Sequence, residues 1–454
     1  MKLLLPLCFA VVLLAGCASS PSSSPVSRET AVTSLDIPAT DDGLPGSGPI
    51  RRYDWFRKLW TERRSRWATQ VKADQGALVF FGDSITQGWG DNLGGNFPGI
   101  KVANRGISGD TTRGLLLRVQ DDVLALNPSG VVLLIGTNDL EEKAFPWTVA
   151  ENLRLLIAAL KKHNPAMPVT LCAVFPSATA MKRPAYKIKR INLLLLEANK
   201  DQPQVTMLDT WTLFANELGD AKPEEFPDLL HPNALGYAKW AAALRPLLAT
   251  QGLLETEADE FLPEAGFVSL FNGRDLTGWS YLPSPDADAT SAKSWQASDP
   301  DAPDWPTVKD KMDFNGLIAS PDGRFLAKKG KLIVTTPSEG RKIQKLWTTR
   351  EFPKNFILKL EFRATPNTDS GIYVRGPQLQ CRDYLLAGPY KQLANYHAQD
   401  WNEIVITVQD GFARCTCNGE ILEAALPVPS SGPLGVEGDR GQMEYRRIRI
   451  QELP

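Results

Sequence analysis

Four short polar segments in the first half of the chain contain the residue types that acyl transfer requires. In sequence order they are Gly82-Asp83-Ser84, residues 104–110, Gly136-Thr137-Asn138 and Asp228-Leu229-Leu230-His231. A serine is a weak nucleophile until a base removes its proton. The oxyanion that forms on the substrate needs preorganised hydrogen-bond donors, each worth roughly 10²–10³ in rate. Together the segments supply a nucleophile, a base, an orienting carboxylate and such donors.

His231 is the strongest candidate for the base. The chain has three histidines, of which His163 ends a predicted helix and His397 lies in the second half. Asp228 precedes His231 by three residues, a spacing that can place carboxylate and imidazole side by side on a helical turn or a tight loop. The carboxylate would fix the tautomer of the ring and stabilise its protonated form. We therefore expect Ser84, His231 and Asp228 to act together.

Predicted strands place these groups at one edge of a sheet. Residues 53–249 alternate apolar runs with helical patterns, which indicates βαβ units and a parallel sheet. In such sheets the site lies at the carboxyl ends of the strands. The backbone N–H groups of Ser84 and Gly109 and the side chain of Asn138 can form an oxyanion hole there. The expected strands are 77–81, 100–103, 130–135, 169–175 and 205–208, and the expected helices are 111–126, 147–163, 186–199 and 234–248.

Residues 78–248 resemble the SGNH (GDSL-like) hydrolase family. The stretches that carry the resemblance are its four sequence blocks, at 81–89, 104–112, 136–139 and 228–231. The resemblance implies a flavodoxin-like three-layer α/β fold with no metal and no organic cofactor. It also implies that Ser84 is the nucleophile, that Gly109 and Asn138 complete the oxyanion hole, and that His231 and Asp228 form the base pair.

The residue after Ser84 indicates which members of the family this chain resembles. Ile85 stands where the family's name has Leu. This variant is common in members that resemble platelet-activating-factor acetylhydrolase and in carbohydrate acetylesterases.

The second half of the chain has the pattern of an all-β domain. Short runs with two-residue alternation and turn signals follow residue 251, which predicts a β-sandwich. The clearest runs are 331–335, 356–362, 371–375, 403–408 and 445–450. Residues 283–306, rich in Asp, Ser, Ala and Pro, are expected to form a long surface loop.

Residues 267–453 resemble the 3-keto-disaccharide hydrolase domain, a concanavalin-like sandwich associated with sugar binding or with cleavage of oxidised glycosides. The matching stretches are 270–279, 369–375, 401–403 and 445–450. Relatives usually read Glu-x-Gln-x-x-Asp where this chain has Gln378-Leu-Gln-Cys-Arg-Asp383. A glutamine cannot act as a general acid or base, so catalysis by this domain is not implied.

A polar cluster in the sandwich is the candidate sugar site. Tyr373 and Arg375 are two residues apart on one predicted strand, and so share a face of the sheet. We expect them to form a sugar-facing cluster with Gln380 and Asp383.

The N-terminus resembles an export signal. The apolar run 3–14 is too short to span a bilayer, and Leu14-Ala15-Gly16-Cys17 resembles a bacterial lipobox. The resemblance implies removal of residues 1–16, lipidation of Cys17 and an exported, membrane-anchored lipoprotein. The alternative is an ordinary secretory peptide with an incidental cysteine. The expected domains are the signal peptide 1–16, a flexible Ser/Pro-rich tether 17–50, the esterase domain 51–250, a linker 251–263 and the sandwich 264–454.

The composition limits the partners. Lys plus Arg (50) nearly balances Asp plus Glu (52), so no global field favours nucleic acid. The basic run 51–66 alternates with aromatic residues and is interpreted as the solvated face of an amphipathic helix.

Three cysteines in the sandwich, Cys381, Cys415 and Cys417, could include a disulfide in an exported protein. A metal site is not favoured, because no histidine lies at ligand spacing.

The leading hypothesis is a lipid-anchored, extracytoplasmic serine esterase that removes acetyl or other short acyl groups from carbohydrate. For the esterase, the alternative is a lysophospholipase-like or lipase-like acylhydrolase. For the sandwich, the alternatives are an independent enzyme acting on 3-keto-glycosides and a non-catalytic carbohydrate-binding module. The sequence indicates no oligomeric state.

Overall fold

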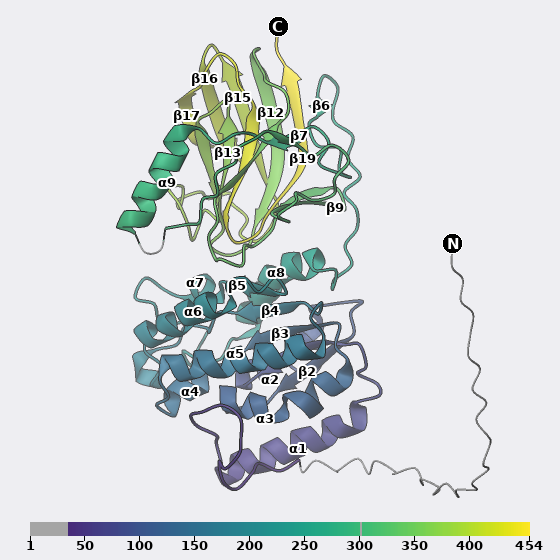
Figure 1. The fold of residues 1–454 in the computed structure, drawn as a ribbon, viewed down its shortest axis with the longest axis vertical. Coiled ribbons are helices and arrows are strands. Elements are labelled where there is room, and N and C mark those ends of the chain that lie inside the picture. The colour runs from purple at the N-terminus through teal and green to yellow at the C-terminus, as the bar shows by residue number, and fades with distance from the viewer. Residues whose placement is uncertain (1–34, 300–301) are drawn as a thin grey trace, which may run out of the picture. The chain divides into compact units, whose positions relative to one another are not determined.

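The fold was analysed in a computed structural model that describes residues 35–299 and 302–454 (Figure 1). The proposed signal peptide and the lipidation site Cys17 lie outside the described residues. No helix within the described ranges is both long enough and apolar enough to cross a membrane.

A five-stranded parallel sheet organises the first domain (Figure 1). Its strand order is β2-β1-β3-β4-β5, the order of flavodoxin-like folds, so the predicted α/β architecture is confirmed. The strands are β1 (Leu78–Gly82), β2 (Val102–Gly106), β3 (Gly130–Leu134), β4 (Val169–Cys172) and β5 (Val205–Leu208). The helices are α1 (Asp54–Gln70), α2 (Ser84–Gly88), α3 (Thr112–Asp122), α4 (Thr137–Glu141), α5 (Pro146–His163), α6 (Ala185–Asn199), α7 (Thr210–Phe214) and α8 (Ala234–Thr250), with short 3₁₀ turns at Leu93–Gly95, Leu124–Leu126 and Thr179–Met181.

Alternate residues of each strand pack against opposite helical layers. Val79 and Phe81 of β1 join a core with α3, α5 and α6. Leu78 and Phe80 join a second core with α2, α7 and α8. Both faces of the sheet are therefore covered, which explains why β1 and β3 are continuous apolar runs in the sequence.

The chain before α1 differs from the expected tether. Ile37 and Ile50 are buried in one cluster with Phe56, Trp60 and Ile107. The backbone carbonyls of Pro45 and Gly48 accept hydrogen bonds from Arg113 of α3 (3.2 and 3.0 Å). Residues 36–50 thus form a packed N-terminal arm of the first domain, because apolar side chains within their mostly polar sequence are buried against it.

The basic run on α1 is also not a uniformly solvated face. Arg64 is buried, and its guanidinium pairs with Asp122 and Asp121 of α3 (3.1 and 2.9 Å). Arg51, just before the helix, is likewise buried and paired with Glu141, at the end of α4, and with Glu142, the residue after it. Acidic partners on other elements, which the local pattern does not reveal, account for the difference.

The second domain is an antiparallel sandwich, as predicted (Figure 1). One sheet has the order β17-β16-β15-β12-β19-β10-β9, with β6 added beside β19, and the other has the order β14-β13-β18-β11-β7-β8. The strands are β6 (Val268–Ser269), β7 (Trp279–Tyr281), β8 (Met312–Asp313), β9 (Phe325–Lys328), β10 (Lys331–Val334), β11 (Gln344–Thr348), β12 (Phe356–Ala364), β13 (Asp369–Val374), β14 (Gln378–Arg382), β15 (Asn402–Gln409), β16 (Phe412–Cys417), β17 (Glu420–Pro427), β18 (Leu434–Arg440) and β19 (Met443–Glu452).

One expectation for the sandwich was wrong, and the open question of its cysteines has an answer. The expected loop 283–306 contains a helix, α9 (Asp286–Ser298), whose first turn carries Asp286 and Asp288 where the helix dipole favours negative charge. No disulfide forms among the described cysteines: Cys381, Cys415 and Cys417 are buried free thiols in the apolar core between the sheets.

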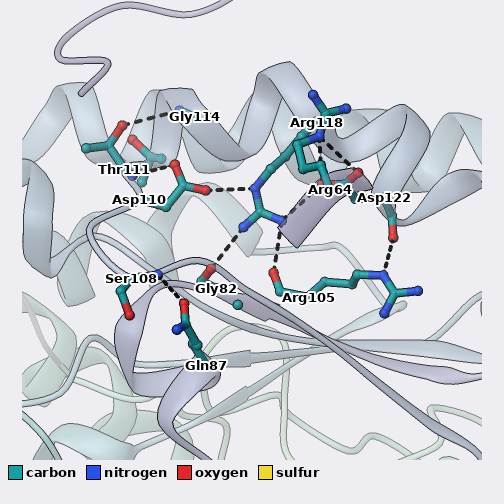
Figure 2. A network of polar contacts seen from close by, with 12 residues as sticks. Arg64, Gly82, Gln87, Arg105, Ser108, Asp110, Thr111, Gly114, Arg118 and Asp122 are labelled. Carbon is teal, nitrogen blue, oxygen red and sulfur yellow. Dashed lines mark hydrogen bonds and ion pairs between the residues drawn. The ribbon is translucent and has the colours of Figure 1, made fainter. Parts of the chain in front are cut away.

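One buried guanidinium connects the strand ends of the first domain (Figure 2). Arg118 of α3 is fully buried and donates from Nε to Asp110 Oδ2 (2.7 Å). Its terminal nitrogens donate to the backbone carbonyls of Gly82, at the end of β1 (3.0 Å), and Arg105, in β2 (2.9 Å). Burial raises the pKa of Asp110 to about 6 even though the Arg118 charge opposes that change. The end of β1, β2 and the loop after β2 are thus held by one side chain.

Replacing Arg118 with Met should destabilise the protein by about 3–5 kcal/mol, because Asp110 is then left buried without its cation. Urea denaturation measures the loss. Arg154→Met is the matched control: its pair with Glu151 is solvent-exposed, and the denaturation midpoint should not move. Equal midpoints for the two variants would contradict the role assigned to Arg118.

Candidate functional site

The structure brings the three predicted catalytic side chains into one hydrogen-bonded row. Ser84 Oγ lies 2.9 Å from His231 Nε2, and His231 Nδ1 lies 2.7 Å from Asp228 Oδ2. Ser84 begins α2 directly after β1, whereas Asp228 and His231 lie in the loop before α8. With Nδ1–H donating to the carboxylate, Nε2 is free to accept the hydroxyl proton of Ser84. This is the geometry of a serine nucleophile with its general base.

A tight turn holds the carboxylate beneath the imidazole. Asp228 Oδ1 accepts the backbone N–H groups of Leu230 (3.0 Å) and His231 (2.7 Å). Leu229 adopts a left-handed conformation (φ 61°) that closes this turn, a strained geometry for a side chain of its size. Partial burial alone would raise the pKa of Asp228, but the hydrogen bonds from His231 and Leu230 outweigh it and hold that pKa below its usual value.

The loop after β2, which carries the predicted oxyanion donor Gly109, is anchored on both sides. The loop after β2 is fixed to α2 by the Ser108 N–H, which donates to Gln87 Oε1 (2.7 Å; Figure 2). It is fixed to α4 by Asn138 Nδ2, which donates to the Asp110 carbonyl (2.9 Å). Gly109, between these two anchors, has φ 87°, which favours glycine. Asn138 Nδ2 carries a second hydrogen, and the Gly109 N–H has no acceptor among the described residues, so both can serve a substrate oxyanion.

Arg183 is a positioning residue that the sequence reasoning missed. Its Nη2 donates to Asn138 Oδ1 (3.0 Å) and to Glu141 (2.8 Å), and its Nε donates to the Thr137 carbonyl (3.2 Å). Arg183 is buried and comes from the loop before α6. It therefore fixes the amide of Asn138 with Oδ1 toward Arg183 and Nδ2 toward the carbonyl of Asp110, the residue after Gly109. No local motif signals this role, because the contact joins segments 45 residues apart.

Asp83, the residue before the nucleophile, is a second buried acid at the site. Its Oδ1 accepts the Ile85 N–H (2.9 Å) and so caps α2. Burial raises the pKa of Asp83 to about 7. Its Oδ2 has no hydrogen-bond partner in the part of the chain that the structure describes. Asp83 thus shapes the turn that presents Ser84.

The structure gathers only part of the predicted sugar-facing cluster. Tyr373 and Gln380 lie on neighbouring strands, on the face turned away from the core between the sheets, where Tyr373 is itself buried; Arg375 and Asp383 do not join them. Beyond the end of β13, Arg375 donates to the carbonyls of Pro429 (3.0 Å) and Lys354. Asp383 is buried, where its carboxylate accepts from the Asn367 N–H and from Gln399. Both are structural anchors, because the chain turns after β13 and after β14.

A glutamate that the sequence reasoning did not single out completes the cluster instead. Glu437 of β18 accepts hydrogen bonds from the Tyr373 hydroxyl (2.8 Å) and from Gln378. Gln380 donates to Gln378 in turn (3.1 Å). The Trp347 ring lies 5.0 Å from the Tyr373 ring. Burial raises the pKa of Glu437 to about 7. A carboxyl group thus lies beside Gln378.

Neither domain shows a group of three or more His, Cys, Asp or Glu side chains that could hold a metal ion, within the described residues.

Replacing Arg183 with Met should lower kcat on an ester substrate about 10–100-fold and change KM little, because the Asn138 amide loses its fixed orientation at the transition state. Steady-state kinetics measures both constants. Arg183→Lys, which keeps one donor, should recover part of kcat. A rise in KM with unchanged kcat would assign Arg183 to substrate binding instead.

Each of the two domains matches a known protein family. Residues 80–239 match the GDSL-like Lipase/Acylhydrolase family, and residues 266–451 match the 3-keto-alpha-glucoside-1,2-lyase-like domain. Human platelet-activating factor acetylhydrolase IB subunit alpha2 is 26% identical over 208 residues, which are 44% of this chain and 87% of that protein. An acetylxylan esterase of Geobacillus stearothermophilus is 50% identical over 42 residues, 9% of this chain and 19% of the esterase.

Solved structures include similar proteins. A GDSL-like lipase from Bacteroides thetaiotaomicron is 28% identical and covers 41% of this chain and 97% of its own, with a TM-score of 0.37. A lipase/acylhydrolase from Enterococcus faecalis is 25% identical and covers 39% of this chain and 97% of its own, with a TM-score of 0.33. From the sequence matches, the chain joins a GDSL-like lipase/acylhydrolase domain to a 3-keto-disaccharide hydrolase-like domain.

Proposed function

We propose that the protein is a serine esterase that removes acetyl or other short acyl groups from carbohydrate. The observation that carries the proposal is the row Ser84 Oγ, His231 Nε2, His231 Nδ1 and Asp228, with contacts of 2.9 and 2.7 Å.

The arrangement supports two half-reactions. Ser84 Oγ attacks the ester carbonyl carbon while His231 takes its proton, and the carbonyl oxygen becomes an oxyanion held by the N–H groups of Ser84 and Gly109 and by Asn138. The intermediate collapses, and the alcohol leaves with the proton from His231. Water, deprotonated by His231, then attacks the acyl-enzyme and releases the carboxylic acid and free Ser84.

Two observations favour an acetylated sugar. The relatives include proteins named platelet-activating factor acetylhydrolase and acetylxylan esterase, both of which name an acetyl group. The attached sandwich belongs to a sugar-associated type. A lysophospholipase-like substrate is the alternative, and acyl-chain preference separates the two.

We also propose that the enzyme works outside the cytoplasm on a lipid anchor. The support is the lipobox-like Leu14-Ala15-Gly16-Cys17 after a short apolar run. Several acyl chains would anchor the protein firmly, whereas one chain would not.

Ser84→Ala should lower turnover of p-nitrophenyl acetate by at least about 10³-fold, because the nucleophile is lost while the oxyanion donors remain. Ser65→Ala, an exposed serine on α1, is the matched control and should retain wild-type turnover. Wild-type turnover by Ser84→Ala would refute the proposal. A preference for long acyl chains in the wild type would favour the lipid alternative.

A second function, sugar binding by the sandwich, is favoured by the cluster around Glu437. Tyr373, Gln378 and Gln380 form a continuous hydrogen-bonded row with this carboxyl group. Trp347 places an aromatic ring beside the row. Polar groups next to an aromatic face suit the hydroxyls and the C–H face of a sugar ring.

Gln380→Ala, made in the Ser84→Ala full-length protein, should weaken retardation in affinity electrophoresis through a soluble polysaccharide such as xylan, because one link of the row is removed. Gln409→Ala, at the exposed end of β15, is the control and should migrate like its parent. If the parent itself is not retarded by any polysaccharide in a panel, the sandwich is not a glycan-binding module.

A further inference from the structure

Arg51 and the first turn of α1 lie against Gly109, the proposed oxyanion donor of the esterase site. A methyl group placed on Gly109 would lie 2.6 Å from Cη2 of Trp55 and 2.9 Å from Nη1 of Arg51. These distances are shorter than van der Waals contact, so both side chains lie directly against the glycine whose N–H is the proposed oxyanion donor. The segment around the start of α1 is therefore part of the rim of the site.

Two aromatic rings on this rim remain open to solvent. Trp55 and Tyr53 are each 52% exposed, and their rings lie 6.3 Å apart with an interplanar angle of 14°. Trp55 is braced from beneath by the buried ring of Phe56, edge-on at 5.6 Å. Contiguous exposed aromatic surface beside a candidate reactive centre is typical of a ligand-binding surface.

Arg51 adds a fixed hydrogen-bond donor next to the rings. Its side chain is only 7% exposed; Glu142, just after α4, accepts from Nε (2.7 Å), and Glu141 of α4 accepts from Nη2 (2.5 Å). Glu141 also accepts from Arg183, which orients Asn138. Among the described residues, Nη1 has no acceptor, and it is the nitrogen that faces Gly109. A donor fixed in this way can serve a substrate oxygen beside the oxyanion hole.

We propose that Trp55, Tyr53 and Arg51 form the subsite for the alcohol part of the ester, and that this part is a pyranose ring. The inference rests on the proposed esterase function and extends it to the substrate's leaving group. A sugar ring offers C–H groups to an aromatic face and hydroxyls to a guanidinium. A long acyl chain would gain nothing from Arg51, whose desolvation it would only make more costly.

The test compares two acetyl esters that differ only in what the subsite would hold. Trp55→Ala should raise KM for an acetylated xylo-oligosaccharide about tenfold, because the stacking surface is lost. It should lower kcat/KM for ethyl acetate much less than kcat/KM for the oligosaccharide, since that leaving group is too small to reach the rings and any disturbance of Gly109 affects both esters alike. Acetate release is measured for both, and the unfolding midpoint confirms that the variant folds.

Trp147→Ala is the matched control. Trp147 is also an exposed tryptophan (60%), stacked on Phe145 at 4.4 Å, and its replacement should change neither substrate's kinetics. Trp55→Tyr, which keeps an aromatic face, should restore most of the affinity for the oligosaccharide.

Each other outcome rejects the subsite. Unchanged KM for the oligosaccharide, or equal losses on both esters, would overturn it, and losses confined to long-chain acyl esters would assign the rings to an acyl chain. If the wild type hydrolyses no ester, the proposed function fails. Calorimetric titration with xylohexaose then decides the subsite by itself, which requires weaker binding by Trp55→Ala than by wild type and Trp147→Ala.

Discussion

The first domain depends on the burial of one cation, Arg118, among carbonyls and carboxylates. Its guanidinium binds the end of β1, the chain of β2 and Asp110 at the same time. The nucleophile follows the first of these and the oxyanion loop follows the second. Because a buried arginine must satisfy its donors, the positions of these segments are coupled to one another. Arg118 thereby fixes the distance between Ser84 and the proposed oxyanion donor Gly109, although it lies outside the candidate site.

Three acids are buried around the same segments. Burial raises the pKa of Asp83 to about 7 and those of Asp110 and Asp139 to about 6. A folded-state pKa above the unfolded value means that each group costs stability as pH rises through that interval. In return these carboxyl groups fix the cap of α2, the bond to Arg118 and, through Asp139 and Thr112, the start of α3. The proposed oxyanion donors, carried by the segments that these carboxyl groups fix, do not need to rearrange when charge develops on the substrate.

The sequence was sufficient for the strands, the sheet type and the catalytic row. Apolar runs revealed the strands because both sheet faces are covered, and His231 was one of only three histidines. It was insufficient wherever a residue acts through a distant partner. Arg183, Arg51 and Glu437 have no local signature, since each takes its role from a side chain on another element. The prediction that Arg375 shares a face with Tyr373 failed because two-residue alternation holds only while the strand continues, and β13 ends at Val374.

Because the catalytic row is open to solvent, substrate selectivity must come from the surfaces around it. The side chains of His231 and Asp228 are 41% and 52% exposed, so the base itself is not enclosed by an apolar pocket that could select a substrate. Chemistry at such a site depends on fixed donors, whereas discrimination must come from the surfaces next to them. The start of α1 supplies one such surface: Trp55 and Arg51 lie against Gly109, and the packed arm places Ile37 and Ile50 in the same buried cluster as Phe56. A segment of this kind can change substrate preference without disturbing the sheet, because only its buried apolar and ionic contacts are needed to hold it in place.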